Sequence, residues 1–439
     1  MAFDYRTATR EQINEVARSL LGKRLIDLDP SVPMVPSSPK NKGVVGMIYE
    51  RAFGIPPNSR PEADFPGAGI ELKSVPIKLI SGEARAKERV SLTMIDFAAL
   101  PAERWETARV RKKLNDLLLI FYRWDPLLPI ARFETLAAEI WRPDDESLRQ
   151  MRLDWESVQA LVASDRRSEV SEGATRLLGA ATKGPGHGST SRAWSLKQTF
   201  VGYIYSSIIS RTVEPVSSAA DPAAAFEQEV LGQLRPYVGK RVSDMAVAAG
   251  RADRQGKAAA AQVVRDLLGQ GAKGRHGGFE RFGIETKVVP VSGAGRVIEA
   301  MSFPAFVHEE LVFETWDASD LLARIQRILI VPIHRERRAP LEDMRLGRPF
   351  FWSPTRPELE RIRVEWEHFR ALIEAGKARE LPKPSETQYI HVRPKARDAR
   401  DRDQAPGGFD VIKKCFWLNQ PYLERILAER GALTPPPPR

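Results

Sequence analysis

Apolar positions follow two periods along the 439-residue chain. Apolar residues three and four positions apart predict a helix directly after Thr9-x-x-Gln12, which has the form of a capping box. The same spacing predicts helices over 44–53, 155–162 and 359–373. Short runs of apolar and β-branched residues predict strands over 70–75, 117–122 and 328–333. This mixture indicates the α/β (α+β) class, with a mixed central sheet flanked by helices.

The pattern occurs twice in the chain. Six short segments return in the same order: 21–25 as 238–242, 69–76 as 283–290, 106–107 as 314–315, 141–143 as 352–354, 155–156 as 366–367 and 196–200 as 412–416. The separation between the two copies is nearly constant along this series, which predicts duplication of a whole domain. The expected domains cover 1–212 and 224–433, with a linker of small residues and two prolines over 213–223 and a tail over 434–439.

Charge and composition narrow the class of partner. The formal net charge is +10, which favours a polyanionic partner, with nucleic acid first and an anionic membrane surface second. An ordinary basic protein is the alternative. A single cysteine, Cys415, excludes a disulfide framework or a cysteine-based zinc site. No apolar run reaches the length of a membrane span, and the N-terminus lacks the apolar core of a signal peptide, so we expect a cytoplasmic protein.

The candidate chemistry lies around the predicted strand at 70–75. Side chains alternate along a strand, so Glu71 and Lys73 share one face. Asp64 precedes Glu71 across a turn that contains Pro66, Gly67 and Gly69. Two carboxylates beside each other suit Mg²⁺, which prefers oxygen ligands and keeps water and a substrate phosphate. The pattern Asp-(x)n-Glu-x-Lys therefore predicts a metal-dependent nuclease, whereas a solvated strand face is the alternative.

A wider set of residues resembles the mismatch-repair nicking endonuclease family MutH. The resemblance rests on Lys42-Gly43-Val44-Val45-Gly46-Met47-Ile48-Tyr49-Glu50, Ala63-Asp64-Phe65, Gly69-Ile70-Glu71-Leu72-Lys73 and Trp105-Glu106-Thr107-x-x-Val110-Arg111-x-Lys113-Leu114. It implies that Asp64 and Glu71 bind Mg²⁺ and that Lys73 is the catalytic lysine. Glu50 is implied as a further acidic site residue and Lys113 as a further active-site lysine.

Two MutH-like domains in tandem resemble the type II restriction endonucleases that cut at GATC. In that group the second domain is a regulatory copy that binds DNA. The resemblance implies restriction-endonuclease-like folds, double-stranded DNA as partner, and a monomer in solution that acts as a dimer or looped complex on DNA. A partner-activated nicking repair enzyme and a site-specific DNA-binding protein without cleavage are the alternative functions.

The second copy is predicted not to cut. Glu285 and Lys287 keep the Glu-x-Lys pair, but Gly278 stands in the place of Asp64. Arg265 falls near the place of Glu50 and Arg324 near that of Lys113. One carboxylate among cations is a poor Mg²⁺ site and a good phosphate-binding surface. A purely structural domain is the alternative.

Sequence readout in a duplex needs arginine, lysine or amide side chains that reach a groove. In the family, the motif matching Arg393-Pro394-Lys395 carries a recognition arginine, whereas the first copy reads Leu178-Gly179-Ala180-Ala181 there. The first domain is predicted to read bases with the glycine-rich loop over 183–197, for which a plain surface loop is the alternative. The predicted DNA-binding residues are Lys183, Ser189, Arg192, Lys197, Arg393, Lys395, Lys413 and Lys414.

Overall fold

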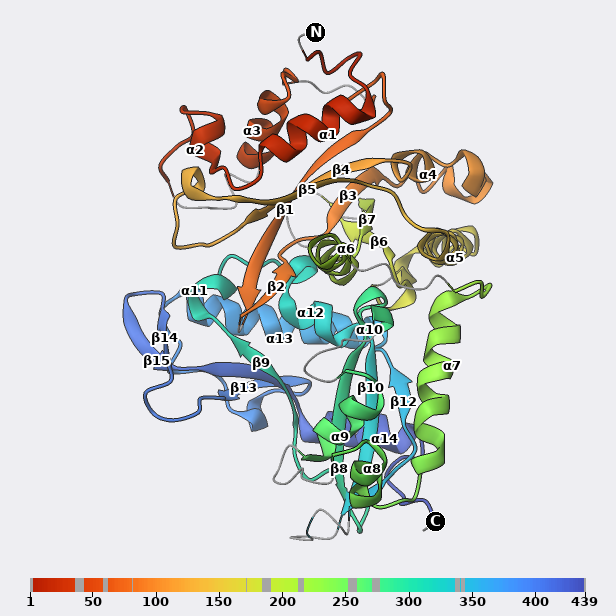
Figure 1. Cartoon of the computed structure of the whole chain (residues 1–439). Coiled ribbons are helices and arrows are strands. Elements are labelled where there is room, and N and C mark those ends of the chain that lie inside the picture. The colour runs from red at the N-terminus through yellow and green to blue at the C-terminus, as the bar shows by residue number, and fades with distance from the viewer. Residues whose placement is uncertain are drawn as a thin grey trace. The chain divides into compact units, whose positions relative to one another are not determined.

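A computed structural model describes the chain at residues 3–35, 43–57, 62–80, 82–170, 172–183, 191–211, 217–251, 259–270, 277–335, 340 and 344–437 (Figure 1). The chain forms two compact units, 1–222 and 223–439. The division falls inside the predicted linker, and a helix already begins at Pro222. No helix in the described ranges combines the length and the apolar character that crossing a membrane requires.

The first unit is built on a four-stranded mixed sheet in the order β2-β1-β4-β5. Strand β1 runs parallel to β4, while β2 and β5 are antiparallel to their neighbours. A second sheet has the order β3-β7-β6. The strands are β1 (Glu71–Ile80), β2 (Glu83–Ala86), β3 (Val90–Met94), β4 (Leu117–Arg123), β5 (Thr135–Trp141), β6 (Leu178–Thr182) and β7 (Arg192–Leu196). The helices are α1 (Arg10–Ser19), α2 (Leu25–Leu28), α3 (Val44–Ala52), α4 (Arg109–Lys113), α5 (Asp145–Ala163) and α6 (Gln198–Ser210).

The second unit repeats this plan. Strand β8 runs parallel to β10, β11 and β12 flank β10 in antiparallel, and a second sheet has the order β13-β16-β9. The strands are β8 (Glu285–Ser292), β9 (Met301–Phe306), β10 (Ile328–Arg335), β11 (Arg345–Leu346), β12 (Phe350–Trp352), β13 (Ile390–Pro394) and β16 (Lys414–Leu418), with the added hairpin β14 (Arg402–Ala405) and β15 (Phe409–Ile412). The helices are α7 (Pro222–Leu234), α8 (Val242–Ala248), α9 (Ala259–Leu267), α10 (Gly277–Arg281), α11 (His308–Leu311), α12 (Asp320–Ile325), α13 (Arg356–Glu374) and α14 (Gln420–Glu429).

The local sequence signals explain the main elements. Thr9 and Gln12 form the predicted capping box at the start of α1. Strand β4 is buried at each position from Leu117 to Tyr122, as expected for a central strand with both faces covered. Strand β1 extends beyond its predicted end, through Pro76, whose carbonyl still accepts from Lys87 N. The α/β class and the mixed central sheet are confirmed.

Four of the six repeat matches are confirmed: three by strand register and backbone shape, and the match of 155–156 with 366–367 by the packing of Trp155 and Trp366 against equivalent tryptophans. In the first domain Leu117 pairs with Glu71 on one neighbouring strand and with Trp141 on the other. In the second domain Ile328 pairs in the same way with Glu285 and Trp352. Gly22 and Gly239 each have positive φ, 72° and 86°, and each lies three residues before the start of a short helix. Because these positions share strand register and backbone shape, they are equivalent in the fold.

Two of the matches are wrong. Trp105 packs against Trp155 with ring centroids 5.8 Å apart, and Trp316 packs against Trp366 at 5.7 Å. Trp105 therefore corresponds to Trp316, and the match of 106–107 with 314–315 is out of register. The match of 196–200 with 412–416 also fails, because strand pairing aligns Leu178 with Ile390 but Leu196 with Leu418, a wider separation. The hairpin β14–β15, inserted between β13 and β16, causes the change.

Candidate active site in the first domain and its counterpart in the second

The first domain brings Asp64 and Glu71 together through a tight turn before β1. Phe65 N donates to Ile70 O at 2.9 Å, and Gly69 adopts a φ of 67° that favours glycine. The turn returns Asp64 to the strand, where its Oδ2 accepts from Leu72 N at 2.7 Å. Asp64 is thereby held beside the first residues of β1.

Two lysines hold the Glu71 carboxylate from opposite oxygens. Lys73 Nζ lies 2.9 Å from Oε1, and Lys113 Nζ lies 2.6 Å from Oε2. Lys73 comes from the same face of β1, two positions along. Lys113 ends α4 shortly before Leu117, the β4 partner of Glu71. The side chains of Lys73 and Lys113 keep 26% and 24% exposure, so their amino groups remain partly open to a substrate.

Burial and mutual repulsion set the charge state of the three acidic residues. Burial raises the pKa of Glu50, and the Asp64 carboxylate raises it further. Burial also raises the pKa of Asp64, with a further rise from Glu71. Burial opposes ionisation of Glu71 too, but Lys73 and Lys113 outweigh it, so the pKa of Glu71 lies below its ordinary value. The site is a compact acidic group that two lysines neutralise only in part.

The donor chemistry of this group fits a hard divalent cation. Asp64, Glu71 and Glu50 offer carboxylate oxygens, which Mg²⁺ prefers. A bound cation would relieve the repulsion that raises the pKa of Glu50 and Asp64. Among the described residues, no group of three or more acidic, histidine or cysteine side chains is arranged to coordinate a metal ion. Instead, Lys73 and Lys113 donate to the two oxygens of Glu71, and the Leu72 amide donates to Asp64 Oδ2.

The second domain keeps the centre of this arrangement with arginine in place of one lysine. Lys287 Nζ lies 3.1 Å from Glu285 Oε1, and Arg324 Nη1 lies 3.1 Å from Glu285 Oε2. Ile328 on β10 is the strand partner of Glu285, as Leu117 on β4 is the partner of Glu71. The separation in sequence between Arg324 and Ile328 equals that between Lys113 and Leu117. Arg324 also bonds Asp320 Oδ2 through Nε at 2.7 Å. Arg324 therefore takes the place of Lys113.

Arg265 takes the place of Glu50. Ile55 N donates to Glu50 O at 2.9 Å to close α3, and Gly54 follows the helix with a φ of 70°. Gln270 N donates to Arg265 O at 2.7 Å to close α9, and Gly269 has a φ of 67°. Because both helices end in the same motif, the two side chains leave the same turn. A guanidinium thus replaces the carboxylate.

The position of Asp64 is filled by an aromatic ring in the second domain. A Cβ atom added to Gly278 would lie 2.6 Å from Cδ2 and Cζ of Phe226, well inside van der Waals contact. Phe226 itself packs edge-on against Phe279, with ring centroids 5.1 Å apart. The second domain therefore has no space for a second carboxylate at this position.

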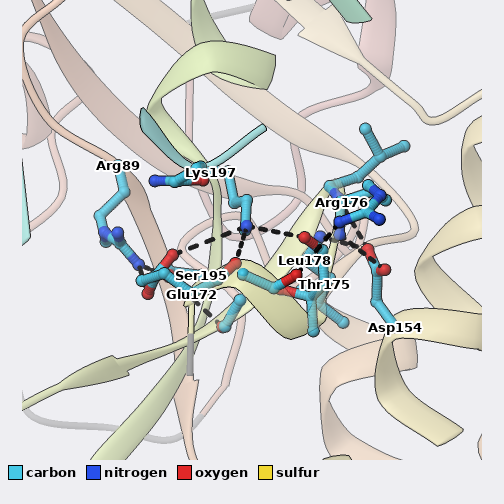
Figure 2. Close-up of polar contacts among 12 residues, drawn as sticks. Arg89, Asp154, Glu172, Thr175, Arg176, Leu178, Ser195 and Lys197 are labelled. Carbon is cyan, nitrogen blue, oxygen red and sulfur yellow. Dashed lines mark hydrogen bonds and ion pairs between the residues drawn. The ribbon is translucent and has the colours of Figure 1, made fainter. Parts of the chain in front are cut away.

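The predicted DNA-reading residues of the first domain have different positions. Lys183 is exposed at the end of β6, and Arg192 is half-buried at the start of β7. Ser189 and the glycine-rich stretch 184–190 lie outside the described residues. Lys197 is 2% exposed, and its Nζ donates to the backbone carbonyls of Glu172 and Thr175 (Figure 2). The prediction that Lys197 contacts DNA is therefore wrong, because its amino group is consumed inside the fold.

In the second domain Arg393 is exposed on β13 and lines a pocket. Lys395 donates to Ser302 Oγ at 3.2 Å and to Phe303 O at 2.6 Å, and Lys413 pairs with Asp401 at 2.7 Å. Lys414, predicted to bind DNA, is half-buried, and its amino group donates to Ala378 O. Arg393 remains the best-placed of these residues to reach a groove.

Sequence reasoning missed the groups that hold these sheets in place. Asp154 accepts from the backbone N–H groups of residues 176, 177 and 178, and Glu365 accepts from those of residues 388, 389 and 390. An acidic residue at equivalent positions of α5 and α13 was the available signal. Phe226 gave no such signal, because α7 is apolar at many positions.

Comparison with known proteins finds similarity to one family in both halves of the chain. A family model described as the DNA mismatch repair enzyme MutH matches residues 53–154 and 274–365. The first match includes Asp64, Glu71, Lys73 and Lys113, and the second includes Gly278, Glu285, Lys287 and Arg324. The resemblance to MutH in both halves of the chain is thus confirmed.

Individual relatives cover the chain to different extents. The type II restriction enzyme Sau3AI of Staphylococcus aureus is 24% identical over 464 residues, which covers 94% of this chain and 93% of that enzyme. The DNA mismatch repair protein MutH of Vibrio cholerae is 27% identical over 215 residues, 47% of this chain and 97% of that protein. A Klebsiella pneumoniae MutH is 31% identical over 156 residues, 35% of this chain and 66% of that protein. The first of these relatives matches the tandem layout.

Proposed function

We propose that this chain, which carries two MutH-like regions in tandem, is a Mg²⁺-dependent type II restriction endonuclease that makes double-strand cuts in DNA. The target is GATC or a close relative. The observation that carries the proposal is the contrast between the two glutamates. Glu71 is held by two lysines beside Asp64 and Glu50, whereas Glu285 is held by Lys287 and Arg324 beside the closed position at Gly278.

The first domain has the groups that phosphodiester hydrolysis requires. Asp64 and Glu71 would hold Mg²⁺, which supplies a water of lowered pKa and polarises the phosphodiester when bound. Lys73 orients the attacking water and offsets the negative charge that develops on the phosphate oxygens. Lys113 holds the second oxygen of Glu71 and adds positive charge on the substrate side. Water adds to phosphorus, the 3′ oxygen leaves with a proton, and the product keeps a 5′-phosphate.

Cleavage of unmethylated phage DNA in the presence of Mg²⁺ tests the proposal, with the wild type compared with Glu71→Ala. We expect discrete fragments from the wild type, none from the variant, and 5′-phosphate ends whose sequence gives the target. Absence of cleavage by both proteins, with retained DNA binding, would instead favour a binding protein that does not cut.

The second domain is proposed to bind another copy of the target and to raise the cleavage rate of the first. In its altered site Arg265 replaces a carboxylate, and Arg324 is 5% exposed and paired with Glu285 and Asp320. The site therefore adds positive charge beside bound DNA rather than ligands for a metal ion. The protein would then bridge two sites in a looped complex as a monomer or dimer. Equal cleavage rates on DNA with one and with two target sites would contradict this role.

A nicking repair endonuclease is the second candidate function. It is favoured by the similarity of each half to proteins named for DNA mismatch repair. Gel analysis of supercoiled plasmid separates the two functions, because a restriction enzyme produces linear DNA and a nicking enzyme stops at the open circle.

A further inference from the structure

The second domain contains a pocket of about 490 Å³ next to Arg393. Arg393 and His391 from β13 and Trp417 from β16 line one side. Asn419, Ala300 and Pro384 are among the other residues that line it. The volume is within the range of small-molecule sites in proteins, roughly 300–1,000 Å³.

The first domain fills the equivalent position with an ion-pair cluster. Arg89 Nη1 bonds Glu172 Oε1 at 2.7 Å and lies 3.4 Å from Ser195 Oγ (Figure 2). Lys197 Nζ lies 3.8 Å from Glu172 Oε2 in the same cluster. Burial lowers the pKa of Lys197 to about 8, while Glu172 opposes this shift. The side chains of Arg89 and Glu172 are 8% and 12% exposed, so the cluster closes this part of the first domain.

Strand register shows which residues of the second domain replace the cluster. Val90 pairs with Leu196 and Met301 with Leu418, so Ala300 corresponds to Arg89. Lys197 donates to Thr175 O and Asn419 Nδ2 donates to Thr387 O, each immediately after the equivalent strand. Glu172 precedes Leu178 by the same number of residues as Pro384 precedes Ile390, the counterpart of Leu178, so Pro384 corresponds to Glu172. An arginine, a glutamate and a lysine have thus been replaced by alanine, proline and asparagine, and a pocket stands in their place.

The polar groups of the pocket favour a neutral ligand that donates hydrogen bonds. Asn419 Nδ2 donates to Thr387 O at 2.8 Å, so its Oδ1 must accept from His391 Nδ1. His391 Nδ1 therefore carries the proton, and its Nε2 has a free lone pair. Nε2 is buried and has no hydrogen-bond partner. Burial lowers the pKa of His391, which keeps the ring neutral.

The remaining groups favour a planar ligand over a phosphate. The rings of His391 and Trp417 are parallel within 10°, with centroids 6.2 Å apart, and both aromatic residues line the pocket. Arg393 offers donors at the pocket wall, but the Glu299 carboxylate also lines it and opposes an anion. A nucleobase combines a planar ring with amino or imino donors for Nε2 and acceptors for a guanidinium.

We propose that this pocket binds a nucleobase, swung out of the duplex from the DNA that the second domain binds. The inference rests on the proposed DNA-binding role of this domain. Arg393 stands both in the pocket and at the exposed end of β13, so one residue links groove contact with base capture. Enzymes that extrude a base hold it by stacking and by hydrogen bonds to its edge, as this pocket would.

The test uses full-length protein with Glu71→Ala, which prevents cleavage, and duplexes with one fluorescent base in the target. Purines are replaced singly by 2-aminopurine and cytosine by pyrrolocytosine, and thymine is probed by permanganate. We expect a several-fold signal increase at one position when protein binds. His391→Phe, which removes Nε2, and Ala300→Leu, which fills the pocket, should each return the signal to that of free duplex. Ala294→Leu, at an exposed turn residue outside the pocket, should leave it unchanged.

Fluorescence anisotropy on the same samples separates the possible failures. Tight binding with no signal at any position would overturn the pocket proposal and leave the proposed function intact. A signal that persists in both pocket variants would also overturn it, because another part of the protein would hold the base. Saturable binding of free deoxynucleoside monophosphates, lost in Ala300→Leu and without any signal from duplex, would show that the base comes from solution and contradict the DNA source. Absence of DNA binding would refute the proposed function itself.

Discussion

The two copies of the site share their central glutamate and differ in what surrounds it. In the first domain Glu71 stands with two further carboxylates, Glu50 and Asp64, against two lysines. In the second, Glu285 is held by Lys287 and Arg324, Arg324 also bonds Asp320, and Arg265 takes the place of Glu50. Changes at three positions turn an acidic group suited to a cation into a basic group suited to phosphate. The strands and turns that hold these residues are the same in both domains, so the chemistry of the site has changed while the fold around it has been kept.

The largest expected difference between the domains concerns Asp64. Asp64→Asn keeps an oxygen acceptor for the Leu72 amide but removes a charged metal ligand. We expect the cleavage rate to fall by roughly 10³-fold, because the charge stabilisation at the phosphate is lost. Single-turnover cleavage at saturating protein measures the change, and circular dichroism checks that the fold is retained. Cleavage within a few-fold of wild type would show that Asp64 does not bind the metal.

A carboxylate should not be tolerated at the matching position of the second domain. Gly278→Asp places a charged side chain against the Phe226 ring, and we expect it to destabilise the second domain by about 3 kcal/mol. Urea denaturation measures the loss. Gly232→Asp, on α7 where an added Cβ meets no atom within 4 Å, is the matched control. Equal stability of Gly278→Asp and the control would mean that Phe226 does not close the site.

Sequence discrimination by the second domain should depend on Arg393. The equivalent position on β6 is Ala181, since Leu178 corresponds to Ile390, so the first domain has no such side chain. Arg393→Ala should cost about 1–3 kcal/mol of discrimination between the target and a one-base variant. Competition binding with the two duplexes measures this loss. Uniform weakening on both duplexes would instead assign Arg393 to the phosphate backbone.

The smallest expected effect concerns the repulsion among the carboxylates of the first site, which lowers the stability of the first domain when no metal is bound. Because burial and Asp64 raise the pKa of Glu50, the folded state binds its proton more tightly than the unfolded chain. This favours folding below the ordinary value of 4.5 and is lost as the pH rises through the raised value. Glu50→Gln should therefore raise the Tm of the first domain at about pH 7.5 by roughly 2–4 °C.

That gain from Glu50→Gln should shrink as the pH falls toward the ordinary value of the glutamate. Thermal melts with EDTA at a series of pH values measure it, with Glu15→Gln on the exposed side of α1 as the control. A gain that does not change with pH would contradict the electrostatic explanation.

The sequence predicted the first site because its signals are local. Asp64, Glu71 and Lys73 lie close together in the sequence on a turn and a strand, and strand alternation alone places Glu71 and Lys73 on one face. Long-range contacts were less accessible. Lys197 looked like a loop cation, but its amino group is buried by Glu172 and Thr175, which come from a separate segment before β6. The closure of Gly278 by Phe226 also depends on contact between distant parts of the chain, which no short motif encodes.

Insertions also shift the sequence separation between equivalent residues of the two domains, and short motifs do not show such shifts. Short motifs matched 196–200 with 412–416, although the hairpin β14–β15 had moved the true counterpart of Leu196 to Leu418. Strand pairing resolves such shifts, because the backbone hydrogen bonds give the partner of each residue directly. With the corrected register, the pocket beside His391 corresponds to the place where Arg89 and Glu172 pair in the first domain.

The central claim is that one domain cuts while the other only binds. Single-turnover cleavage of a two-site duplex by wild type, Glu71→Ala and Glu285→Ala tests it directly. We expect Glu71→Ala to lose roughly 10³-fold or more in rate, and Glu285→Ala to lose no more than about tenfold through weaker binding of the second site. Comparable losses in the two variants, or one strand cut by each domain, would contradict the account.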